Sequence, residues 1–166
     1  MKNIVILASG NGSNYQYISE NIDVNKINIC ALICNKPKAN VIKKANNNGH
    51  KVIILEQGEL SRERYDLELV SAILNLNKNI DLIVLAGWMR ILTPVFISSF
   101  DNIINLHPAL PGQFPGANAI EEAFTAFKNG DISKTGVMVH RVIEKIDAGE
   151  VINSVEVEIK NNDTLE

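Results

Sequence analysis

Short runs of valine, isoleucine and leucine alternate with helical patterns, and this alternation limits the possible folds more than any other feature of the chain. The apolar runs lack polar alternation, which is typical of strands buried on both faces. Between them, apolar residues recur at helical spacing, as at Tyr65, Leu69, Ala72, Ile73 and Leu76. Alternating strands and helices predict parallel strands joined by right-handed crossovers. We therefore expect a mostly parallel α/β sheet with helices on both faces.

The expected elements follow one another with short connections. Strands are predicted at residues 3–9, 26–34, 51–55, 80–87, 102–105, 135–142 and 149–159, and helices at residues 15–22, 39–49, 61–77 and 119–130. The last two strands lie close together in the sequence, which predicts an antiparallel pair. Ligands of such sheets bind beyond the carboxyl ends of the strands, so the loops that follow strands are the candidates for function.

Composition restricts the class of protein. A length of 166 residues suits one domain, and a net charge of -3 with dispersed lysines argues against nucleic acid as a partner. No apolar run approaches the roughly 20 residues that span a membrane, and the amino terminus is interpreted as a strand rather than a signal peptide, which predicts a cytoplasmic protein. Cys30 and Cys34 would lie roughly 13 Å apart on one strand, so we expect buried, unbridged thiols.

The loop SGNGSN, residues 9–14, follows the first predicted strand. Its glycines allow close backbone approach, and the next helix would direct its amino-terminal amides at a ligand, for which phosphate is the natural choice. A dinucleotide site is disfavoured because Tyr15 stands where the third glycine of G-x-G-x-x-G would be. The alternative is a tight turn with Asn and Ser capping.

The segment NLHPALPGQFPG, residues 105–116, holds three of the five prolines and must form a shaped loop after a strand. Asn105 and His107 would share one face if the strand end is extended. Asp147 either caps a turn or reaches His107 and favours a protonated ring that donates to an oxyanion. Because no serine or cysteine nucleophile is evident, the attacking group would belong to a substrate. The scattered histidines predict no metal site.

Five segments together carry a specific resemblance: SGNGSN, LAGWMRIL, NLHPALPGQFPG, GVMVH and DAGEVI. In order and approximate spacing the chain resembles the glycinamide ribonucleotide transformylases, or phosphoribosylglycinamide formyltransferases, over essentially its whole length. The resemblance implies the formyltransferase fold, a Rossmann-like twisted sheet with an antiparallel carboxyl-terminal pair. It implies a single domain over residues 1–166 that lacks the family's carboxyl-terminal helix and tail. We expect a monomer or homodimer.

The implied reaction transfers the formyl group of 10-formyltetrahydrofolate to the amine of glycinamide ribonucleotide in purine biosynthesis. Gly12, Ser13 and Asn14 correspond to the loop that holds the ribonucleotide phosphate. Folate contacts are implied for Arg62, Met89, Arg90, Ile91, Leu92, Asn105, Ile143, Glu144, Lys145, Ile146 and Asp147. Arg64 is the competing assignment for Arg62.

The catalytic trio implied by the resemblance is Asn105, His107 and Asp147. Asn105 and protonated His107 would stabilise the tetrahedral oxyanion, and Asp147 would sustain the imidazolium and assist proton transfer. His140 is expected behind these groups. The fold is shared by formyltetrahydrofolate deformylases and methionyl-tRNA formyltransferases, from which the phosphate-type loop and the absence of an added domain separate this chain. A non-catalytic folate-binding remnant is the remaining alternative.

Overall fold

The structure is a computed structural model that describes residues 1–165, so Glu166 lies outside it. The chain divides into two compact units, Met1–Ile104 and Asn105–Glu166. The expected single domain over residues 1–166 stays a prediction. Among the described residues, no helix is both long enough and apolar enough to cross a membrane.

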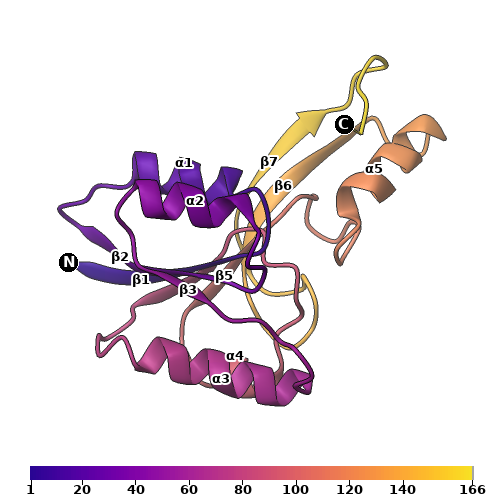
Figure 1. The fold of residues 1–166 in the computed structure, drawn as a ribbon. Helices are drawn as coiled ribbons and strands as arrows, with labels where there is room; N and C mark the ends of the chain where they lie inside the picture. Colours follow the sequence, from indigo (N-terminus) through magenta and orange to yellow (C-terminus); the bar gives the residue numbers. More distant parts are fainter. Residues whose placement is uncertain (166) are drawn as a thin grey trace. The chain divides into compact units, whose positions relative to one another are not determined.

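The first unit alternates strands and helices as the sequence predicts. Its elements are β1 (Lys2–Ala8), α1 (Ser13–Asn21), β2 (Ile27–Cys34), α2 (Asn40–Asn47), β3 (Val52–Ile54), α3 (Arg62–Leu74), β4 (Leu82–Leu85), α4 (Pro94–Ile97) and the start of β5 (Ile103–His107). The strand order is β3-β2-β1-β4-β5. β1 runs parallel to β2 and β4, and β2 runs parallel to β3. Helices α1 and α2 cover one face of this sheet, and α3 and α4 cover the other (Figure 1).

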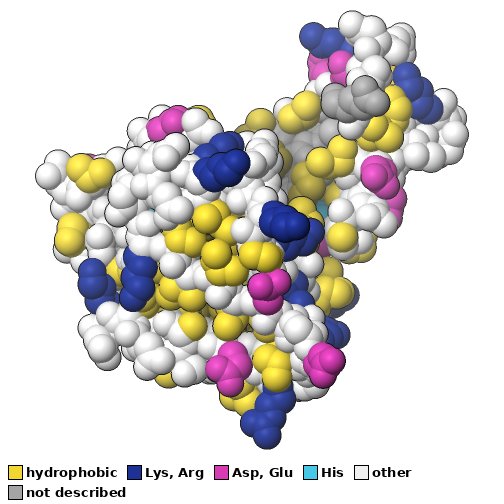
Figure 2. Space-filling model, viewed as in Figure 1, with side chains coloured by type: hydrophobic (Ala, Val, Ile, Leu, Met, Phe, Trp, Pro, Cys, Tyr) yellow, Lys and Arg dark blue, Asp and Glu magenta, His cyan; other side chains and the backbone are white. Residues whose placement is uncertain are grey.

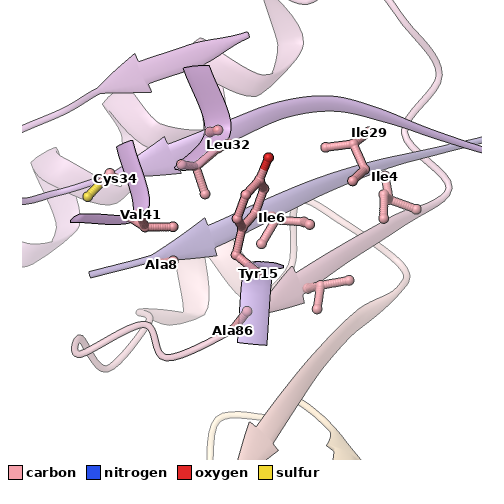
Figure 3. Packing of buried hydrophobic residues seen from close by; sticks show 11 residues of the cluster. Ile4, Ile6, Ala8, Tyr15, Ile29, Leu32, Cys34, Val41 and Ala86 are labelled. Atoms are coloured by element: carbon pink, nitrogen blue, oxygen red, sulfur yellow. The ribbon is translucent and has the colours of Figure 1, made fainter. Parts of the chain in front are cut away.

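The core of this unit explains why the apolar runs have no polar alternation. The central strands β1, β2 and β4 are buried on both faces because helices cover each side. Under α1 and α2, the ring of Tyr15 points into a cluster that includes Ile6, Leu32 and Val41 (Figure 3). The Tyr15 side chain is fully buried, and its hydroxyl pairs with Nδ1 of His50 at 2.5 Å. That bond satisfies the polar end of a buried aromatic side chain.

The second unit contains the end of β5, then α5 (Ala119–Lys128), β6 (Lys134–Arg141) and β7 (Val151–Glu158), with the strand order β5-β6-β7. β6 and β7 pair antiparallel. On β6, the buried positions Gly136, Met138 and His140 alternate with more exposed ones. β7 is exposed along its length, and hydrophobic side chains are visible over it in the upper right of Figure 2. One face of β6 is therefore buried, and His140 is the last residue of that face.

The predicted fold class is confirmed: the sheet is mostly parallel, helices cover both faces of its parallel part, and the carboxyl-terminal strands are antiparallel. Cys30 and Cys34 are buried free thiols, as predicted. The sequence did not predict α4. This helix has four residues, too few for a periodic pattern, and begins with Pro94 at a position where proline is favourable.

Candidate active site

The carboxylate of Asp147 is the centre of the predicted catalytic trio. Its Oδ2 accepts the amide of Gly116 at 2.8 Å and lies 3.4 Å from Nδ1 of His107. Its Oδ1 accepts from Nδ2 of Asn105 at 3.3 Å and lies 3.3 Å from Nε2 of His140. The structure therefore brings Asn105, His107 and Asp147 together, and it adds His140 to them.

The surroundings of Asp147 hold it in the ionised form. Burial is the largest influence and opposes ionisation, but the bonds from His140 and the Gly116 amide and the charges of His107 and His140 outweigh it, so the pKa of Asp147 lies below its ordinary value. The side chain is 11% exposed. The pKa of His140 is raised, first by its hydrogen bond to Asp147. The several donors around this buried carboxylate, called the hub below, therefore favour its charged form.

His107 is buried at the end of β5, and each of its ring nitrogens lies close to an oxygen atom. Nε2 lies 2.9 Å from the carbonyl oxygen of Phe114. A carbonyl oxygen can only accept, so Nε2 carries a proton. Nδ1 faces Asp147. The Pro/Gly loop therefore folds back toward His107, and the carbonyl of Phe114 in this loop fixes the tautomer of the ring. Phe114 has a positive φ of 43° at this bend.

The predicted phosphate loop lies in the first unit, at the start of α1. Gly12 has a φ of 75°, and a Cβ there would lie 2.8 Å from Cα of Val41, so the position requires glycine. Ser13 and Asn14 begin the helix, and no side chain of the described residues caps it. The first turn contains no acidic residue. Its amides are therefore available to an anion.

The predicted folate segment follows β4, and the loop after β1 supports it. Ser9 is buried, donates its amide to Gly87 at 3.0 Å, and accepts the amide of Met89 on its hydroxyl at 2.9 Å. Within this segment, Met89 and Ile91 are exposed and Leu92 is buried. The segment thus presents two apolar side chains to solvent, while Ser9 holds its backbone through hydrogen bonds.

Helix α3 holds the same segment from the other side. The guanidinium of Arg90 stacks on the ring of Tyr65, 4.1 Å from its centroid, and donates to Gln57. Arg90 Nε and Trp88 Nε1 are buried and have no hydrogen-bond partner among residues 1–165. Arg62 donates to the carbonyl of Ile91 at 3.1 Å. These contacts make α3 the support of the segment.

A buried carboxylate completes this support. Asp66, 1% exposed, accepts both the amide of Thr93 at 2.6 Å and its hydroxyl at 2.8 Å.

Of the two competing arginines, Arg62 is the one that contacts the folate segment, because it donates to the backbone carbonyl of Ile91. Arg64 uses its amide to complete the Ser61 cap of α3. Whether either arginine contacts folate stays a prediction.

The predicted loop over the pterin joins β6 and β7 in the second unit. Four of its side chains are exposed: Ile143, Glu144, Lys145 and Ile146. Asp147 closes the loop with a φ of 48°, a left-handed conformation that aspartate tolerates better than most residues. The loop therefore presents two apolar side chains and ends at Asp147.

Sequence reasoning anticipated one further feature of the site and missed another. His140 was expected behind the trio, and it contacts Asp147 and Asn105. Asp66 was not singled out, although it lies on the buried face of α3 with Leu69 and Ile73. In both cases a signal was present, because a polar residue occupied a position of the apolar period.

Comparisons with known proteins identify the family of the chain. Residues 2–166 match the model of the formyl transferase family, and the chain belongs to that family. The phosphoribosylglycinamide formyltransferase of Dictyostelium discoideum is 46% identical to it, over 99% of this chain and 87% of the relative. That of Escherichia coli is 37% identical, over 98% of this chain and 76% of the relative.

Solved structures give the same answer for the fold. The crystal structure of phosphoribosylglycinamide formyltransferase from Streptococcus pneumoniae superposes with a TM-score of 0.87 at 35% identity, over 99% of this chain and 86% of that one. The enzyme from Bacillus halodurans superposes with a TM-score of 0.88 at 33% identity, over 98% and 83%. The chain is thus a formyltransferase in fold and in family.

Proposed function

We propose that the chain transfers the formyl group of 10-formyltetrahydrofolate to the amine of glycinamide ribonucleotide, a step of purine biosynthesis. The observation that carries the proposal is the buried carboxylate of Asp147, which lies within 3.4 Å of an amide and two imidazoles. The names of the relatives support this acceptor, and the family implies a formyl-folate co-substrate. Both substrates are small molecules, and the proposal places the reaction in the cytoplasm.

The proposed chemistry is direct acyl transfer. The amine lone pair bonds to the formyl carbon, and the carbonyl electrons move onto oxygen. N–H groups of Asn105 and His107 stabilise this oxyanion, a contribution worth on the order of 10²-fold in rate for each donor. When the intermediate collapses, the bond from carbon to folate N10 breaks. The proton lost by the amine reaches N10 through ordered water, with Asp147 as the relay.

His107 enters this scheme with its proton already placed. Its Nε2–H is held by the Phe114 carbonyl at 2.9 Å, and Nδ1 is oriented by Asp147. In the reaction we expect Nε2–H to turn from the neutral carbonyl to the oxyanion, because a hydrogen bond to a charged acceptor is roughly twice as strong. The N–H is fixed in the plane of the ring, so the exchange requires a small rotation of the ring, and the stiff Pro/Gly loop limits any further movement.

The substrate contacts of the proposal follow from the surfaces already described. The ribonucleotide phosphate binds the amides of Gly12, Ser13 and Asn14 at the start of α1, where no side chain of the described residues competes for them. The folate binds the segments that carry the exposed apolar side chains, residues 89–92 and 143–147. An apolar wall with a few fixed polar groups is what a pterin ring requires.

The test is a direct assay of the product. The purified chain is mixed with glycinamide ribonucleotide and 10-formyltetrahydrofolate, and formylated ribonucleotide is measured by mass spectrometry. We expect product from the parent chain and a loss of at least about 10²-fold in His107→Ala. Glu122→Gln, an exposed change on α5 in the same unit, is the matched control and should equal the parent.

Other outcomes identify the alternatives. Formate released without formylated ribonucleotide would indicate a deformylase. Formylation of methionyl-tRNA in place of the ribonucleotide would indicate a tRNA formyltransferase. A folded chain that binds folate by titration but yields neither product would be a non-catalytic folate-binding protein, and each of these results would overturn the proposal.

A further inference from the structure

His140 is a buried titratable group to which the proposed mechanism gives no role. It ends the buried face of β6 and is 2% exposed. Its Nε2 lies 3.3 Å from Oδ1 of Asp147 and 3.2 Å from Nδ2 of Asn105. A histidine in contact with both the hub and an oxyanion donor can change what each of them does.

The proton on the far side of the ring is fixed by the backbone. Nδ1 of His140 lies 2.9 Å from the carbonyl oxygen of Arg141. That oxygen can only accept, so Nδ1 donates to it and always carries a proton. Nε2 is therefore protonated only in the imidazolium form, and it presents a lone pair in the neutral form.

Nε2 of His140, Oδ1 of Asp147 and Nδ2 of Asn105 form a nearly equilateral triangle with sides of 3.2, 3.3 and 3.3 Å. When the ring is neutral, Nε2 of His140 and Oδ1 of Asp147 both present lone pairs. The Asn105 amide then donates one N–H to Nε2 and the other to Oδ1. When the ring is charged, Nε2–H donates to Oδ1. Nε2 then no longer accepts from Asn105, and one N–H of the amide becomes available.

We propose that His140 is a positioning residue whose protonation frees an N–H of Asn105 for the formyl oxygen, so that the imidazolium form is the active one. This inference rests on the proposed function. His140 would then control the reaction through its protonation without touching substrate, because it acts through Asn105 and Asp147.

The charged groups around His140 favour this reading. Asp147 faces it directly, and His107 lies edge-on with 6.5 Å between ring centroids. On its own strand, the Arg141 side chain pairs outward with Glu150 at 3.2 Å. Because the bond to Asp147 raises the pKa of His140 from its ordinary 6.5, the charged form persists above that pH. Activity should therefore fall on the alkaline side, as His140 loses its proton.

Two variants separate this role from simple packing. His140→Gln places a side-chain amide that can donate to Asp147 at every pH, whereas His140→Ala supplies no donor. His140→Ala has no lone pair that accepts from Asn105, so it should lack the alkaline limb of kcat set by His140, whereas a residue that only packs would leave that limb in place. His140→Gln keeps a donor to Asp147 at every pH and should likewise lack the limb, with the KM for folate little changed.

A measurement that does not depend on catalysis accompanies the kinetics. NMR of the ¹⁵N-labelled chain should show Nδ1 of His140 protonated throughout and Nε2 titrating above pH 6.5, with the side-chain amide signals of Asn105 following the same titration. The Asn105 response should persist in His107→Gln and vanish in His140→Gln. These signals test the switch even if the assay finds no formyl transfer, so the two proposals can fail separately.

The proposal is overturned by any of three results. The first is an Asn105 amide that does not respond to the titration of His140. The second is an alkaline limb of kcat that is unchanged in His140→Gln. The third is a His140→Ala variant that folds, as judged by its amide spectrum, yet keeps the alkaline limb of kcat.

Discussion

Asp66 offers the sharpest test of how the folate segment is held. Its carboxylate, 1% exposed, accepts two bonds from Thr93, at 2.6 Å from the amide and 2.8 Å from the hydroxyl. Thr93 is itself buried at 3% exposure, so water does not readily replace a lost acceptor. Changing Asp66 should therefore destabilise the chain and loosen the segment that precedes Thr93.

The magnitude follows from the kind of acceptor left behind. Asp66→Asn keeps a neutral oxygen, and losing the charge from two bonds should cost about 2 kcal/mol of unfolding free energy. Asp66→Ala leaves two buried donors without an acceptor, at about 1–3 kcal/mol each, so we expect about 4 kcal/mol. Glu68→Gln, an exposed carboxylate on the same helix, is the control and should cost less than about 0.5 kcal/mol.

Urea unfolding followed by circular dichroism measures these differences. With slopes of about 1–3 kcal/mol/M, the midpoint of Asp66→Asn should fall by roughly 1 M at unchanged slope, and that of Asp66→Ala by about twice as much. The KM for folate should rise in both variants while the control keeps parental values. Equal midpoints for parent and Asp66→Asn, or equal losses in the two variants, would refute the reasoning.

Three further predictions follow from single contacts. Gly12→Ala should cost more unfolding free energy than Gly130→Ala, because both have positive φ but a Cβ at Gly12 also meets Val41, and urea midpoints will show whether the order holds. The thiol of Cys34, fully buried and with its pKa raised by burial, should react with a thiol reagent at pH 8 only after denaturant is added. The pKa of Asp147 is lower in the folded chain than its ordinary 3.8, so the ionised carboxylate stabilises the fold above that pH, and this stabilisation is lost as the pH falls through the folded pKa. The unfolding free energy of Asp147→Asn, measured against pH, should lack this loss.

The order of elements could be predicted from the sequence because each depends on local pattern. Uninterrupted apolar runs require burial on both faces, and helical periods between them supply the cover, so the parallel sheet and its antiparallel end follow directly. The role of Gly12 could also be predicted from the local sequence, since the turn after β1 needs a positive φ. The pairing of Asn105 and His107 on one face also follows from the period of an extended strand.

The contacts of the hub were decided by tertiary structure. Asp147 lies 42 positions from Asn105 in the chain, and whether it capped a turn or reached His107 depended on how the loop between β6 and β7 folds back. The place of His140 depended on the register of β6. Local propensity acts over a few residues, whereas these distances are set by packing between elements remote in sequence. The sequence therefore determined which groups were available, and the fold determined that one carboxylate meets two imidazoles and an amide.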